Sequence, residues 1–100
     1  MPIYKHSSMD TLYYDEDEEP WIDHPCEVQV DGGLITVSYT SDDEKITYTG
    51  HEQAPGIYLL KGTDDCNATL YGFEKSKIMY GGWSYKAHRG LWKIVLGQAE

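Results

Sequence analysis

The fold is decided by residues 26–40, which read Cys-Glu-Val-Gln-Val-Asp-Gly-Gly-Leu-Ile-Thr-Val-Ser-Tyr-Thr. On both sides of Asp31-Gly32, apolar and polar residues alternate, as in β-strands that have one buried face and one face in water. An Asp-Gly pair favours a type I′ turn, because both central residues of that turn need a positive φ. The sequence therefore predicts a β-hairpin here, with Val28 opposite Ile35.

The alternation continues beyond this hairpin. Pairing Tyr39 with Ile46 and Val37 with Tyr48 gives a second hairpin around the polar turn 41–44, again with one apolar face. Further strands are expected between short connections, at residues 57–61, 68–74, 77–85 and 90–96. The pattern predicts an all-β fold, a small antiparallel meander of about seven to eight strands that forms a barrel or a compact sandwich.

Residues 1–25 are less regular and acidic. Residues 1–44 hold 12 acidic side chains against one lysine, residues 45–100 hold 5 against 7 basic ones, and the net charge is −9. The adjacent carboxylates at 15–19 need water around them. We therefore expect an acidic, partly irregular segment over residues 1–25, with at most a short strand near Ile3. It would pack on an antiparallel β domain over residues 26–97.

Composition narrows the classes of function. A negatively charged chain repels phosphate backbones, which argues against nucleic-acid binding. No apolar run is long enough to span a bilayer as a helix, and the first residues do not resemble a signal peptide. We therefore expect a cytoplasmic protein without a membrane partner. Cys26 and Cys66 are too few for a disulfide framework and are expected to be reduced thiols, although their pairing stays open.

Residue types that could carry chemistry are scattered along the chain. His24 lies close to Cys26, but there is no paired Cys/His framework of the kind that structural zinc sites need. His51 and Glu52 are adjacent, and neighbours along a strand point to opposite faces. The sequence therefore predicts no metal, no cofactor and no catalytic residue, and it argues against an enzyme.

The C-terminal strands are apolar on both faces, which a free-standing antiparallel sheet does not need. If Trp83 and Trp92 face the core, the opposite face carries a set of candidate contact residues. These are Tyr71, Phe73, Ile78, Tyr80, Leu91 and Val95. Either the N-terminal segment covers this second face through Tyr13, Tyr14 and Trp21, or the face is a contact surface for another chain.

These patterns favour a non-enzymatic protein-interaction domain, whose partner is another protein or a second copy of the chain in a homodimer. One alternative is a small-molecule-binding β-barrel, lined by Val37, Tyr39, Tyr48, Trp83 and Trp92. Strands of about five or six residues between the predicted turns are short for a ligand barrel, which favours the interaction domain. A further alternative, an acidic inhibitor or immunity-type protein that imitates nucleic acid, depends on net charge alone.

Overall fold

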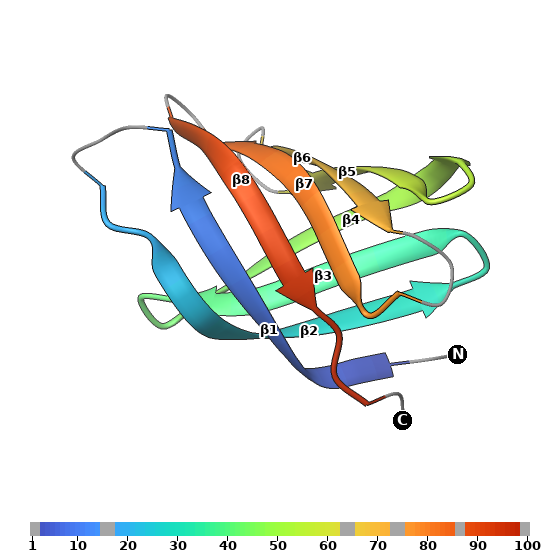
Figure 1. Cartoon of the computed structure of the whole chain (residues 1–100), viewed down its shortest axis with the longest axis horizontal. Helices are drawn as coiled ribbons and strands as arrows, with labels where there is room; N and C mark the ends of the chain where they lie inside the picture. Colours follow the sequence, from blue (N-terminus) through green and yellow to red (C-terminus); the bar gives the residue numbers. More distant parts are fainter. Residues whose placement is uncertain (1–2, 15–17, 63–65, 73–75, 86–87, 99–100) are drawn as a thin grey trace.

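The chain folds into a closed antiparallel β-barrel. The computed structural model describes residues 3–14, 18–62, 66–72, 76–85 and 88–98. Each strand pairs with the next in chain order, and the first pairs with the last (Figure 1). The strands are β1 (Ile3–Tyr13), β2 (Trp21–Asp31), β3 (Leu34–Ser41), β4 (Glu44–Ala54), β5 (Ile57–Gly62), β6 (Asn67–Gly72), β7 (Ile78–Tyr85) and β8 (His88–Val95). The predicted all-β meander is confirmed, in its barrel form.

The hairpin of β2 and β3 forms as predicted, but its turn lies one residue later. Gly32 and Gly33 are the central residues, with φ of 57° and 87°. Val28 therefore lies opposite Val37, so the predicted pairing with Ile35 was wrong. Two glycines adopt a positive φ more readily than aspartate followed by glycine. The error shifts the partner by two residues, which keeps the same side chains on the buried face.

The hairpin of β3 and β4 has the predicted register, with Val37 opposite Tyr48. Its turn residues Asp42 and Asp43 have φ of 50° and 64°. Aspartate enters this left-handed region more readily than most residues, because its short polar side chain can form a local hydrogen bond. Turn chemistry and the apolar pattern agree at this hairpin, and the register follows from both.

The N-terminal segment differs from the irregular one that we expected. β1 is a strand of 11 residues that lies between β2 and β8 and closes the barrel. β2 begins at Trp21 and runs past residue 25 without a break. Register shifts interrupt the β1–β2 pairing between Tyr4 and Ser7 and between Met9 and Thr11. Such bulges change the phase of a strand, so β1 lacks the regular alternation that marks strands in a sequence.

Three strands are longer than predicted. β1, β2 and β4 each have 11 residues. β4 continues to Ala54, through residues that we assigned to a loop because they are polar. These residues are exposed on the barrel surface, where polar side chains are compatible with a strand. The objection to a ligand barrel that was based on short strands therefore does not hold.

The core is a cross-strand arrangement of tryptophan and glycine surrounded by aliphatic side chains. Trp92 is buried and lies opposite Gly81, while Trp83 lies opposite Gly90. The Tyr48 ring packs edge-to-face on Trp92, with ring centroids 4.9 Å apart. An eight-stranded barrel has room for little more than side chains. A β-carbon at Gly90 would lie 2.9 Å from Trp83 Nε1, so this glycine leaves space that the Trp83 ring occupies.

Two neighbouring glycines of β7 have opposite environments. Gly81 faces inward, and a β-carbon there would overlap the carbonyl oxygen of Thr69 and lie 2.9 Å from a methyl carbon of Leu70. Gly82 faces outward, and a β-carbon there would meet only the Gly90 carbonyl oxygen, at 3.7 Å. The first position requires glycine for packing, whereas the second accepts a methyl group.

We expect Gly81→Ala to lower the free energy of unfolding by about 2 kcal/mol or more, because the added methyl group overpacks the barrel wall. Gly82→Ala is the matched control and should change it by less than about 0.5 kcal/mol. Urea denaturation of both variants measures the difference. Equal effects at the two positions would contradict the inward and outward assignment.

Candidate functional site

Large apolar side chains are exposed together on the outside of β5 to β8 and of β1. Tyr71 lies opposite Tyr80 in the register of β6 and β7. Leu91 lies opposite Leu12 where β8 meets β1. We call the exposed set the outer face; it consists of Leu12, Leu59, Tyr71, Tyr80, Leu91 and Val95, each 38% to 59% exposed. Several large apolar side chains exposed on neighbouring strands are characteristic of contact surfaces.

Most of the candidate contact residues predicted from the sequence lie on the outer face. Tyr71, Tyr80, Leu91 and Val95 are exposed there, and Ile78 is half-buried beside Val95. Phe73 lies outside the described residues. Sequence reasoning missed two members, Leu12 and Leu59. Leu12 joins the face only because the barrel closes. Leu59 could have been predicted, because successive side chains of a strand point to opposite faces and its neighbour Leu60 is buried.

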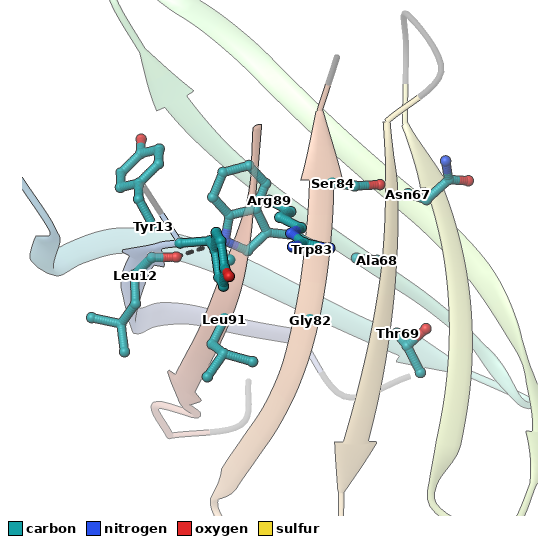
Figure 2. Close-up of a pocket in the computed structure, with 12 residues that line it drawn as sticks. Leu12, Tyr13, Asn67, Ala68, Thr69, Gly82, Trp83, Ser84, Arg89 and Leu91 are labelled. Carbon is teal, nitrogen blue, oxygen red and sulfur yellow. Dashed lines mark hydrogen bonds between the residues drawn. The ribbon is translucent and has the colours of Figure 1, made fainter. Parts of the chain in front are cut away.

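A shallow groove of about 780 Å³ crosses the outer face at Gly82 (Figure 2). Thr69 of β6 and Leu91 of β8 flank Gly82 in register. The Leu12 and Leu91 side chains stand side by side in Figure 2 and form a ridge along the groove. Trp83 Nε1 donates a hydrogen bond to the carbonyl oxygen of Leu12, at 3.3 Å. The missing side chain at Gly82 thus creates a recess next to an apolar ridge.

Charge is divided sharply between the two halves of the barrel. Over the residues of strands β5 to β8 there is no aspartate or glutamate, whereas Lys61, Arg89 and Lys93 are present. The net charge of −9 is therefore carried by the other strands and by the connections. On the outer face the nearest carboxylate in register is that of Asp10 on β1, which lies opposite Lys93.

The described part of the N-terminal segment does not cover the outer face, contrary to one of the two alternatives above. The Tyr13 ring packs edge-to-face on Trp83, with centroids 5.2 Å apart. The Trp21 ring lies against His24, with centroids 4.8 Å apart. Tyr14 lies at the end of the groove, with its ring centroid 4.3 Å from the Arg89 guanidinium carbon. The outer face stays exposed.

A second site lies at the end of the barrel that holds the β3–β4 turn. A cavity of about 330 Å³ opens there, which we call the barrel mouth, and all three tryptophans and four of the nine tyrosines line it. These aromatic residues are Tyr13, Trp21, Tyr39, Tyr48, Trp83, Tyr85 and Trp92. Of the five residues that the sequence predicted to lie in the interior or to line a ligand site, Val37 is fully buried in the core, and the other four line the mouth.

The hydroxyl groups deep in the mouth are neutral. Burial raises the pKa of Tyr39 to about 12, although a hydrogen bond with Tyr48 lowers it in part. Burial also raises the pKa of Tyr48, and hydrogen bonds with the Cys66 thiol and with Tyr39 add to that increase. Cys26 and Cys66 are both free and buried, and burial raises the pKa of Cys26 to about 12. A protonated, buried thiol such as that of Cys26 is a poor nucleophile.

Metal ligands do not converge in the described part of the chain, where no three His, Cys, Asp or Glu side chains are arranged to hold an ion. His24 Nε2 is within hydrogen-bond distance of the Thr40 carbonyl oxygen, at 2.8 Å. Among the described residues there is also no helix with the length and apolarity to cross a membrane.

Comparisons with known proteins add no assignment, since no protein-family model, curated protein or solved structure matches the chain significantly. The functional argument therefore depends on the geometry of the outer face and of the barrel mouth.

The raised pKa values of Tyr39 and Tyr48 predict that the folded protein loses stability at alkaline pH. Tyrosine in an unfolded chain ionises near pH 10, whereas folding holds Tyr39 and Tyr48 neutral to higher pH. A pKa that is raised on folding gives stability that is complete below the unfolded value and is lost as the pH rises above it. We expect the free energy of unfolding to fall between about pH 10 and about pH 12. Denaturant titrations at each pH, with tyrosinate absorbance in parallel, measure this.

The variant Tyr48→Phe removes one of these groups and should show a smaller loss of stability between neutral and alkaline pH. If all tyrosines ionise near pH 10 while the protein stays folded and equally stable, the buried and neutral state of Tyr39 and Tyr48 is refuted.

Proposed function

We propose that this domain is a non-enzymatic protein-interaction module and that its outer face binds a second copy of the chain. The observation that carries the proposal is two exposed apolar pairs in neighbouring rows of the sheet: Tyr71 opposite Tyr80, and Leu91 opposite Leu12. Leu12, Leu91, Tyr80 and Tyr71 lie on four consecutive strands, and each exposes a large apolar side chain. The fold itself does not require them, because the barrel is already closed and filled from inside. Exposed apolar patches of this kind usually mark interfaces.

The distribution of charge supports a second copy as the partner. A chain with a net charge of −9 repels its own copies in most orientations. Strands β5 to β8 contain no carboxylate, and Asp10 of β1 lies opposite Lys93, so few carboxylates come close together when two outer faces meet. Most carboxylates of each chain then lie outside the contact. Face-to-face association therefore keeps most of the negative charge of the two chains apart.

The shape of the face supports a two-fold arrangement. The recess at Gly82 lies beside the ridge of Leu12 and Leu91 on the same surface. In a two-fold dimer the same patch is used twice, so the ridge of one chain can enter the recess of the other. The tyrosine hydroxyls of Tyr71 and Tyr80 suit the border of such a contact, where a ring is buried and its hydroxyl reaches water.

Native mass spectrometry and light scattering from about 1 μM to about 500 μM test the proposal. We expect a dimer that dissociates on dilution. The double variant Tyr80→Ser/Leu91→Ser should be monomeric over this range, because it removes two large apolar groups from the centre of the contact. Its thermal unfolding should change little, since both side chains are about half exposed.

The matched control is Ile22→Ser on β2. Ile22 and Leu91 are equally exposed, at 59%, but Ile22 lies off the outer face. This control should dimerise as the unmodified chain does. A chain that is monomeric at every concentration overturns the proposed self-association. A dimer that survives the change at Tyr80 and Leu91 shows that another surface makes the contact.

A further inference from the structure

The barrel mouth has an aromatic content that core packing does not explain. All three tryptophans of the chain border this single cavity, although they come from β2, β7 and β8. Only Trp83 and Trp92 are buried, whereas Trp21 is half-buried at the rim. A core needs apolar volume, which aliphatic side chains supply equally well. Aromatic rings that line a cavity open to solvent differ from core residues, because they can present their π faces to a ligand.

The rim of the mouth is negatively charged. Glu18, Asp42 and Glu44 lie there and are exposed. Of the described residues that line the cavity, none is a lysine or an arginine, and His88 is the one basic side chain. Three carboxylates around an opening of low polarity create a negative potential that attracts cations and repels anions.

We propose that the barrel mouth binds a small organic cation, with its ammonium group among the rings of Trp21, Tyr39 and Trp92 and close to the carboxylates of the rim. Aromatic faces attract a cation through their quadrupole, and recognition of alkylated ammonium groups by clustered rings is a common use of this attraction. The mouth shares Tyr13 and Trp83 with the groove but contains none of the residues that define the outer face, so this inference does not depend on self-association.

The dimensions of the cavity support a ligand of modest size. A volume of about 330 Å³ is near the lower end of the range of small-molecule sites. Tyr39 and Trp92 are edge-to-face, with ring centroids 6.4 Å apart, and Tyr48 also packs edge-to-face with Trp92. His24 in turn packs edge-to-face on Tyr39, with centroids 5.6 Å apart. These contacts fix the ring orientations before a ligand arrives, which limits the entropy lost on binding.

The chemistry of the wall argues for a cation over a neutral apolar ligand. The hydroxyl groups of Tyr39, Tyr48 and Tyr85, together with Ser41, give the cavity acceptor oxygens. A purely apolar molecule would desolvate the rim carboxylates without compensation. An alkylammonium ion keeps its charge near the carboxylates while its methyl groups contact the rings.

The test uses the full chain and four probes: tetramethylammonium, choline, benzyltrimethylammonium and 3,3-dimethylbutan-1-ol, the neutral isostere of choline. Tryptophan fluorescence is a direct readout, because every tryptophan borders the cavity. We expect at least one cation to bind with a dissociation constant below about 10 mM, and choline to bind about tenfold or more tightly than its isostere. Binding should weaken as salt is added.

Two variants and one control separate the contributions. Asp42→Asn/Glu44→Gln removes two rim charges and should weaken choline binding about threefold or more at low salt; asparagine tolerates the positive φ of Asp42. Trp21→Leu should weaken it similarly, through loss of a ring. The control Glu27→Gln/Asp31→Asn removes two β2 charges that are not among the lining residues, and should leave binding unchanged.

Each other result overturns the proposal. Equal binding of choline and its neutral isostere shows a cavity that accepts apolar molecules without selecting charge. Failure of every cation to bind below about 10 mM shows that the mouth is not a cation site. Equal weakening by the rim variant and by the control shows that net charge, and not the rim, attracts the ligand.

Discussion

The pairing of β1 with β8 is the constraint on which the rest of the molecule depends. It runs from Ser8 opposite Val95 to Tyr13 opposite Gly90, and it converts two edge strands into paired ones. Side-chain contacts reinforce it at both ends. Ser7 Oγ accepts a hydrogen bond of 3.0 Å from the Gly97 amide, and Trp83 Nε1 donates to the Leu12 carbonyl oxygen. These bonds join segments that are far apart in the chain, so their formation costs more loop-closure entropy than that of a hairpin.

Closure also determines what each side chain can do. Once the sheet is a cylinder, alternate residues point to a small interior or to solvent, and the interior accepts only a limited volume. Gly81 and Gly90 help to satisfy that limit, since a β-carbon at Gly90 would crowd the Trp83 ring and one at Gly81 would crowd the Leu70 side chain. Gly82, between two such positions, faces the other way and forms the recess of the outer face. One glycine-rich hairpin thus shapes both the core and the candidate interface.

Sequence reasoning succeeded where local chemistry and long-range pattern agree. The β3–β4 register followed from a polar turn and clean alternation, and the apolar set on the C-terminal strands followed from alternation alone. It failed at β1, whose bulges remove the alternation, and at the β2–β3 turn, where a third turn-forming residue, Gly33, permitted two registers. The place of Leu12 on the outer face could not be predicted from the sequence, because only the closure of the barrel brings it beside Leu91.

The register of β7 and β8 determines which side chains form the outer face and which line the barrel mouth. Along β7 and β8, Tyr80 and Leu91 point outward, while Trp83 and Trp92 point inward, and the two sets alternate. A slip of one residue would exchange them, placing indole rings in solvent and tyrosine and leucine in the interior. Apolarity cannot prevent that exchange, because both sets are apolar. The glycines oppose it, because a β-carbon at Gly90 would lie 2.9 Å from Trp83 Nε1 and one at Gly81 would lie 2.9 Å from a methyl carbon of Leu70. Gly81 and Gly90 therefore favour the register in which Trp83 and Trp92 enter the core while Tyr80 and Leu91 stay exposed.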